Sequence, residues 1–218
     1  MHALQGRWPV DSAPVLTGAD PDAVAAVGAD LVHRWSEPHR RYHDLTHLTE
    51  VLAAVDALSR SERLGEDDRS VARLAAWFHD AVHAGATDGA DERGSADLAA
   101  RSMRALGAGE GVVERVVRLV LDTVEHDVEA DGGDRARPVL HDADLWILSA
   151  PVTRFDDYCR QVRAEYARVG ERDYAAGRTA VLRPFLVRPH VYVTPYARRE
   201  WEPAARENLA RELTRLAG

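Results

Sequence analysis

The spacing of apolar side chains constrains the fold of this chain more than any other feature of its sequence. Leu45, Leu48, Leu52 and Val55 recur every three or four residues, which places them on one face of a helix. A helix with such a stripe becomes stable when the stripe packs against other elements. The sequence therefore predicts a helix that begins near Arg41 and packs among other helices.

Other segments carry the same period or the residues that begin and end helices. Asp20 followed by Pro21 is typical of a helix N-terminus, so a helix is expected up to about residue 35. Further helices are expected over residues 67–82, 91–106, 111–126, 140–148 and 153–169, and from near Glu202 onward.

Three stretches lack a helical signal. Residues 84–90 and 128–138 have the small and polar composition of loops. Residues 181–193 contain Pro184 and Pro189, which remove backbone donors and interrupt helices. We expect an irregular course over all three stretches.

Residues 111–126 carry a mixed signal. Their many valines favour a strand, but their charged residues recur at helical spacing. The helical spacing of the charged residues outweighs the strand propensity of the valines, so we expect a helix here as well. Because no other segment favours a strand, the sequence predicts an all-α fold. The expected organisation is one domain over residues 1–218, with a core over about 20–150 and a helical extension over about 151–218.

Composition limits the partners and the compartment. The net charge of −8 disfavours long nucleic acid and membrane surfaces as partners. No apolar run approaches the length that spans a bilayer, and residues 1–7 lack the apolar stretch of a secretory signal. The single cysteine, Cys159, suits a reducing compartment. We therefore expect a cytoplasmic protein, and a homodimer stays open because the final helix is able to pack on a second copy.

Two short histidine clusters carry the chemistry. His43 and His47 are four residues apart, so on a helix they project from the same face. Imidazole nitrogens bind divalent metals and also transfer protons, and both roles are open to this pair. An isolated pair of this kind more often belongs to a packed or solvated helix face.

Acidic residues next to apolar segments strengthen the case for a metal. His79 and Asp80 follow the apolar residues 74–78, and a carboxylate there needs a partner or a metal unless it caps its helix. Asp142 and Asp144 pose the same question later in the chain. Because they are two residues apart on an expected helix, we expect one to ligate and the other to bond elsewhere.

The order His47, His79-Asp80, Asp144 resembles the HD superfamily of metal-dependent phosphohydrolases, whose core is an α-helical bundle. More narrowly, the chain resembles an uncharacterised bacterial group described as predicted HD superfamily hydrolases. The similarity is carried by residues 41–47, 78–80, 91–96, 140–145, 162–166, 177–178 and 205–209. It implies an HD-domain helical bundle with additional C-terminal helices.

The resemblance also implies roles for individual residues. His47, His79, Asp80 and Asp144 would hold the first metal ion, and Asp80 would bridge two ions if a second one binds. His43 matches in spacing the proton-donating histidine of the cyclic-nucleotide phosphodiesterase branch, which makes it a candidate general acid.

Further candidates surround this set. A second metal ion or an orienting role is open to His83, Glu92, His126 and Asp142. Arginines would bind the remaining phosphate charge, and the candidates are Arg41, Arg93, Arg163 and Arg178. Most of the 28 basic residues must nevertheless be ordinary surface residues.

The chemistry of the ligands limits the metal and the substrate. Mixed histidine and carboxylate ligands suit one or two ions of manganese, iron, cobalt, nickel or zinc, and magnesium suits them less well. Such an ion lowers the pKa of bound water and polarises a phosphoryl oxygen. The expected function is hydrolysis of a phosphate ester of a nucleotide or another small molecule by metal-activated water.

Three alternatives remain at this stage. Some HD-type proteins resemble oxygenases that use two iron ions, and His83, Glu92 and His126 could supply their extra ligands. A non-catalytic metal-binding or ligand-binding module would keep the metal without turnover. A plain helical interaction protein would leave the histidine and aspartate clusters unexplained.

Overall fold

The computed structural model describes residues 3–86, 89–124 and 133–218. Within these residues every regular element is a helix and there is no strand, which confirms the all-α prediction for them. None of their helices combines the length and the apolar composition that crossing a bilayer requires. The elements in chain order are α1 (Ala3–Ser12), α2 (Pro21–Trp35), α3 (Leu45–Ser61), α4 (Glu66–Phe78), α5 (Ala90–Ala105), α6 (Glu110–Leu121), α7 (Ala136–Asp144), the 3-10 helix η1 (Leu145–Ser149), α8 (Val152–Glu165), α9 (Glu171–Val187), α10 (Pro195–Glu200) and α11 (Glu202–Ala217).

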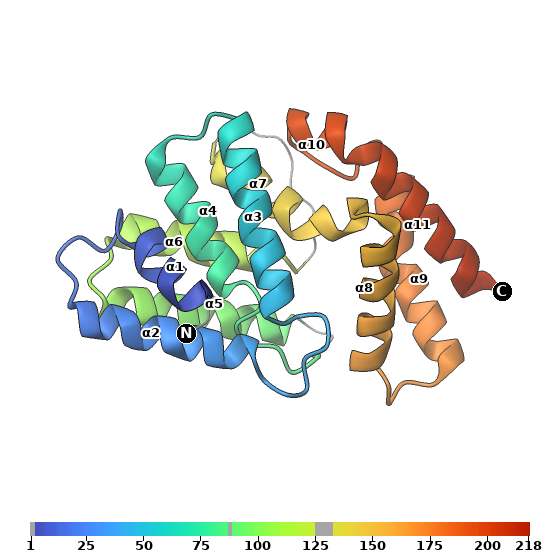
Figure 1. The fold of residues 1–218 in the computed structure, drawn as a ribbon, viewed down its shortest axis with the longest axis horizontal. Coiled ribbons are helices and arrows are strands. Elements are labelled where there is room, and N and C mark those ends of the chain that lie inside the picture. The colour runs from blue at the N-terminus through green and yellow to red at the C-terminus, as the bar shows by residue number, and fades with distance from the viewer. Residues whose placement is uncertain (1–2, 87–88, 125–132) are drawn as a thin grey trace.

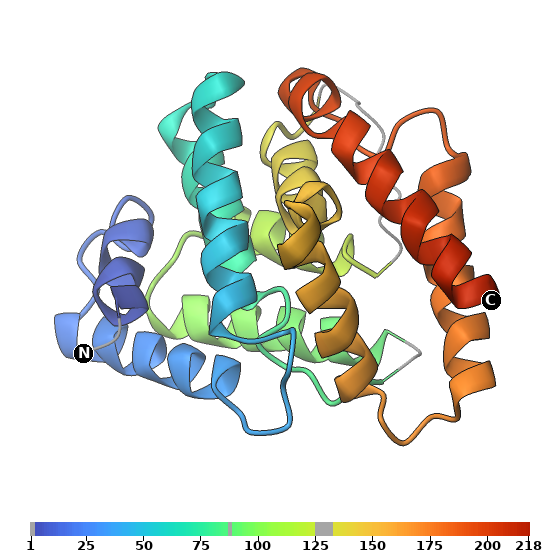
Figure 2. The same ribbon diagram turned by 45° about the vertical axis from the view of Figure 1, so that its right-hand side comes forward.

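Helices α3, α4 and α7 pack against one another in the middle of the molecule. Helix α6 lies on α4, and α5 lies on α6. Helices α1 and α2 lie at one end of the molecule, on the left of Figure 1, and α9 and α11 lie at the other end, on the right. Figure 2 shows the same separation from a second direction. The C-terminal helices reach the centre because α11 packs on η1.

The core follows from the apolar stripes. The predicted stripe of α3 is buried at Leu48, Leu52 and Val55. The last turns of α4 are buried on every side, because α3, α6 and α7 all pack around this helix. Trp8 of α1 closes the core from the N-terminal end, with its ring edge-on to Trp77. The metal candidates at the end of α4 therefore emerge from the most enclosed part of the fold.

Several predicted helices are confirmed. Asp20 caps α2 by accepting a hydrogen bond from the backbone N–H of Asp22. The helix expected over residues 91–106 is α5, and the last one begins at Glu202 as expected. The valine-rich stretch forms α6 and buries Val113, so helical period outweighs strand propensity in its described part.

The helix that carries His47 begins later than predicted. Helix α3 starts at Leu45, because the side chain of Asp44 accepts hydrogen bonds from the N–H groups of Thr46 and His47. His43 consequently precedes the helix, and the argument that placed it one helical turn from His47 was wrong.

The region with two prolines, residues 181–193, was predicted correctly only in its second part, because residues 188–193 lack regular structure but residues 181–187 are helical. Residues 171–187 form the continuous helix α9. Pro184 lies in the last turn of α9, so the backbone hydrogen bond that it cannot donate weakens only the end of the helix. Leu182 and Phe185 on either side of it are buried at helical spacing. Helices α1 and α10 carried no signal that we had used to predict them.

Buried polar side chains fasten the segment between α9 and α10 to the rest of the molecule. Glu202 and Asp142 accept hydrogen bonds from successive backbone N–H groups of residues 191–194. Asn208 of α11 donates to the carbonyl of Leu148 at the end of η1. These bonds satisfy backbone groups that would otherwise be buried without partners.

Candidate metal centre

Four predicted ligands come from three packed elements. His47 lies in the first turn of α3, where the Asp44 cap fixes the start of the helix. His79 is the C-cap of α4, and Asp80 follows it. Asp144 is the last residue of α7. Because α3, α4 and α7 pack against one another, the ends of these helices bring the four side chains together.

The distances between their ligand atoms suit a metal ion. Nε2 of His47 lies 3.2 Å from Nε2 of His79 and 3.2 Å from Oδ1 of Asp144. Nε2 of His79 lies 3.3 Å from Oδ2 of Asp80 and 3.4 Å from Oδ1 of Asp144. Ligands about 2.1 Å from a tetrahedral ion are separated by roughly 3.4 Å. The cluster therefore has the spacing that a divalent transition metal requires.

The protonation of His79 also suits a ligand. Its Nδ1 lies 2.8 Å from the carbonyl oxygen of Ala76. A carbonyl only accepts hydrogen bonds, so Nδ1 carries a proton, and Nε2 is the atom that would offer a lone pair to a metal ion. Both His47 and His79 are buried, which excludes competing solvent contacts over most of each ring.

Charge is concentrated at this cluster. Burial lowers the pKa of His79, but the charges and hydrogen bonds of Asp80 and Asp144 raise it well above its ordinary value. Burial raises the pKa of Asp80, but the charge and hydrogen bond of His79 lower it overall. The two carboxylates thus favour a positive charge among them, and a divalent cation supplies one.

Arg40 holds the two ligand-bearing segments together. Its buried guanidinium donates to the carbonyls of His43, Asp80 and Ala81, at 2.9, 2.8 and 3.2 Å. It also lies over the ring of Trp35, 5.4 Å from its centroid. Arg40, and not the predicted Arg41, therefore has a structural role here. Its planar guanidinium carries several N–H donors, which suits binding to three carbonyls that converge on it.

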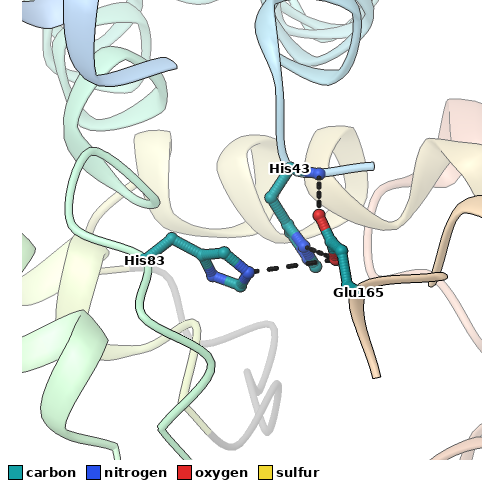
Figure 3. A group of neighbouring side chains, drawn as sticks. All are labelled: His43, His83 and Glu165. Atoms are coloured by element: carbon teal, nitrogen blue, oxygen red, sulfur yellow. Dashed lines mark hydrogen bonds and ion pairs between the residues drawn. The ribbon is translucent and has the colours of Figure 1, made fainter. Parts of the chain in front are cut away.

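His43 is paired with a carboxylate that the sequence did not single out. Oε1 of Glu165, at the end of α8, accepts from the backbone N–H groups of Arg41, Tyr42 and His43 at 2.8, 2.9 and 3.1 Å. Oε2 of Glu165 lies 2.7 Å from Nδ1 of His43 (Figure 3). Burial lowers the pKa of His43, but the Glu165 hydrogen bond and nearby carboxylates raise it above its ordinary value.

His83 faces the same carboxylate from the loop after α4 (Figure 3). Its ring stacks on His43 with centroids 4.2 Å apart, and its Nε2 lies 3.9 Å from Oε2 of Glu165. Burial and the neighbouring charge of His43 lower the pKa of His83 to about 4. The ring is therefore neutral near neutral pH.

Three of the four metal candidates, His47, Asp80 and Asp144, line a cavity of about 190 Å³. Its wall includes His43, Asp80, Asp144 and Arg178. Arg178 comes from α9, donates to the hydroxyl of Tyr158 and keeps its Nε buried without a hydrogen-bond partner in the described structure. Buried polar atoms without partners are rare in folded proteins, so this Nε marks a position where a ligand atom would be accommodated.

Two more orphaned atoms belong to the same wall. The hydroxyl of Tyr42 and Oε2 of Glu92 are buried without partners among the described residues. Burial, together with the charges of Asp80 and Asp91, raises the pKa of Glu92. Glu92 thus lies where the sequence had suggested an orienting residue.

Asp142 and the remaining arginines do not line this cavity in the described structure. Asp142 accepts from the backbone N–H groups of residues 193 and 194 and from Nδ1 of His141, so its oxygens are used within the protein. Arg163 donates to backbone carbonyls at the end of α8. Arg41 and Arg93 are exposed and do not line the cavity in the described structure.

His126, one of the predicted site residues, lies outside the residues that the structure describes. The two site residues that sequence reasoning missed are Arg40 and Glu165. A signal for Glu165 existed, because it lies within residues 162–166, one of the stretches that carries the resemblance. Arg40 directly precedes the first histidine cluster and offered no distinguishing pattern.

Comparison with known proteins does not add a relative. No protein-family model matches the chain, and neither a curated protein nor a solved structure matches it. The resemblance to the HD superfamily therefore stays a prediction from the sequence.

Proposed function

We propose that this protein is a metal-dependent phosphohydrolase with an HD-type helical bundle, and that it cleaves a small phosphate ester. The observation that carries the proposal is the convergence of two imidazole nitrogens and two carboxylate oxygens beside one cavity, with His47, Asp80 and Asp144 in its wall. The same wall includes a histidine–glutamate pair and a buried arginine. Ligands, proton donor and anion-binding group are what hydrolysis of a phosphate ester requires.

The ligand set favours a transition metal. His47, His79, Asp80 and Asp144 would hold the ion, and two nitrogen with two oxygen ligands suit manganese, iron, cobalt, nickel or zinc better than magnesium. When bound, such an ion would polarise a phosphoryl oxygen and lower the pKa of a bound water. The remaining steps depend on groups of the chain itself.

His43 is suited to protonate the leaving oxygen. Its Nδ1–H donates to Glu165, which fixes the orientation of the ring and stabilises the imidazolium form. Its Nε2 makes no hydrogen bond to any described residue, and the side chain lines the cavity. We assign His43 the role of general acid, with Glu165 as its positioning residue.

Arg178 is suited to bind the phosphate. A buried guanidinium with an unused Nε forms charge-assisted hydrogen bonds with an anionic ligand, and the low polarity around it strengthens them. Among the four arginines that the sequence suggested, Arg178 alone lines the cavity in the described structure.

A second cavity of about 410 Å³ adjoins the first and gives room for the rest of the substrate. The two cavities share Tyr42, His43, Tyr158 and Arg178 on their walls. Aromatic rings stack on planar organic groups, which makes an ester with a heterocyclic or aromatic group, such as a nucleotide, a suitable substrate. The net charge of −8 and the buried free thiol of Cys159 support a small-molecule partner and a cytoplasmic setting.

The test begins with the metal. Elemental analysis of the purified protein is expected to give about one or two equivalents of a transition metal, and the His79→Ala, Asp80→Ala double variant should lose the equivalent that these two residues help to hold. Circular dichroism should show that the variant still folds. Asp30→Ala is the matched control, because Asp30 is an exposed residue of α2 that pairs with Arg34 of the same helix, away from the cluster.

Turnover is then measured on p-nitrophenyl phosphate, bis-p-nitrophenyl phosphate and a panel of nucleotides, with each metal in turn. The proposal expects phosphate release by the wild type and by Asp30→Ala, and none by Asp80→Ala. Activity that persists in Asp80→Ala would show that the assigned centre is wrong. Two equivalents of iron without any ester cleavage would favour the oxygenase alternative instead.

A further inference from the structure

A second group of metal-binding side chains lies beside the four-ligand centre. His43 precedes α3, His83 follows α4 and Glu165 ends α8, and Figure 3 shows the two rings and the carboxylate facing one another. One ligand atom of each residue lies within 4.8 Å of those of the other two. Three elements thus bring together two imidazoles and one carboxylate.

The distances leave room for an ion at His83. Nε2 of His83 lies 3.9 Å from Oε2 of Glu165, which is too long for a hydrogen bond. Ligands about 2.1 Å from an ion are separated by roughly 3–4 Å, depending on the angle between them. An ion bound to both atoms therefore fits this gap.

The ring of His83 makes no hydrogen bond within the described structure. Its Nδ1 lies 3.9 Å from the nearest oxygen of Asp91, and its side chain is 13% exposed. Polar groups buried to this degree ordinarily have partners. This Oδ2 of Asp91 accepts hydrogen bonds from the backbone N–H groups of residues 84–86, so it is already used by donors other than His83.

Access and protonation favour coordination. A cavity of about 520 Å³, bordered by His39, His83 and Glu165, opens beside the group. Nδ1 of His43 lies 2.7 Å from Oε2 of Glu165, so a proton lies between these two atoms, and the ring of His83 makes no hydrogen bond in the described structure. Only the proton between His43 and Glu165 has to leave when an ion arrives.

We propose that His43, His83 and Glu165 form a second transition-metal site, separate from the four-ligand centre. Two imidazoles and one carboxylate suit zinc, cobalt, nickel or copper, and they suit magnesium and calcium poorly. With three protein ligands in place of four, this site binds its ion more weakly than the first. The proposal concerns binding alone, and its test measures bound metal and not turnover. An ion at this site displaces the proton between His43 and Glu165, so its binding opposes the role of His43 as a general acid.

The test is a metal titration of the untagged, metal-free full chain. Zinc or cobalt is added, and bound metal is measured by equilibrium dialysis and elemental analysis. We expect about two equivalents for the wild type and about one for His83→Ala. The His79→Ala, Asp80→Ala double variant should lose the tighter equivalent and keep the weaker one. His33→Ala, which removes an exposed histidine of α2, should still bind two.

Three results would overturn the proposal. They are a single equivalent in the wild type, two equivalents in His83→Ala, and loss of both equivalents in the double variant while it stays folded. Glu165→Gln provides a second variant if His83→Ala does not fold, because its amide oxygen can still accept from the backbone N–H groups of residues 41–43. A folded Glu165→Gln that keeps both equivalents would also refute the site.

Discussion

Glu165 offers the sharpest quantitative test of the structure. Its carboxylate accepts three backbone hydrogen bonds and one from His43, and its side chain is 6% exposed. Glu165→Gln keeps the shape and one acceptor oxygen but removes the negative charge. It therefore isolates the contribution of the charge from that of packing.

The size of the effect follows from the pKa of Glu165. Burial alone would raise this pKa, but the hydrogen bond and charge of His43, with the N–H groups of Arg41 and Tyr42, lower it from 4.5 to about 2. At about 1.4 kcal/mol per pKa unit, the fold favours the ionised carboxylate by about 3 kcal/mol. We expect Glu165→Gln to lower the free energy of unfolding by about 2–3 kcal/mol at pH 7.

The effect should depend on pH in a defined direction. The folded pKa lies below the unfolded one, so the stabilisation is complete above about pH 5 and is lost as the pH falls toward 2. The difference between wild type and Glu165→Gln should shrink by about 1 kcal/mol between pH 7 and pH 4. Urea denaturation of the metal-free proteins, followed by circular dichroism at both pH values, measures this difference.

The control is Glu207→Gln, because Glu207 is an exposed residue of α11. It should change the free energy of unfolding by less than about 0.5 kcal/mol at either pH. A Glu165→Gln effect below that limit, or one that is the same at pH 7 and pH 4, would refute the reasoning.

Three other variants test the site. Asp144→Asn should weaken metal binding by at least about 100-fold, measured by competition with a chelator, whereas Asp142→Asn should keep the metal and lose about 3 kcal/mol of stability in urea. Arg178→Met should lower kcat/KM for phosphate esters by about 10- to 100-fold without changing metal content. Activity should decline as the pH rises through the elevated pKa of His43, and in Glu165→Gln this decline should move to lower pH, because the charge that raises that pKa is gone.

The sequence predicted what depends on local patterns. The period of apolar residues predicted α3 and α6, and the Asp-Pro pair predicted the start of α2. The ordered set of His47, His79-Asp80 and Asp144 predicted two histidines whose Nε2 atoms each lie within 3.7 Å of an oxygen of Asp80 and of an oxygen of Asp144. Helix ends and short motifs depend on a few neighbouring residues, and they could therefore be recognised from the sequence.

Features that depend on distant contacts could not be predicted in this way. Glu165 meets the segment before α3 across more than 120 positions of chain, and no pattern near either residue encodes that contact. The choice between Asp142 and Asp144 depends on where residues 193 and 194 pass, because their N–H groups use the oxygens of Asp142. The continuity of α9 through Pro184 likewise depends on burial of its neighbours in the tertiary fold.

The fastening of residues 191–194 has a consequence for how the chain can be divided. Helix α7 ends at Asp144 and contains Asp142, which accepts a hydrogen bond from residue 193. Helix α11 is bonded to residue 191 through Glu202 and to the carbonyl of Leu148 through Asn208. A fragment that stopped at residue 150 would leave the carboxylate of Asp142 buried without its donors, one helical half-turn from a metal ligand. The C-terminal helices are thus a structural condition of the candidate metal centre, because without them α7 would have to bury the carboxylate of Asp142 without its backbone donors.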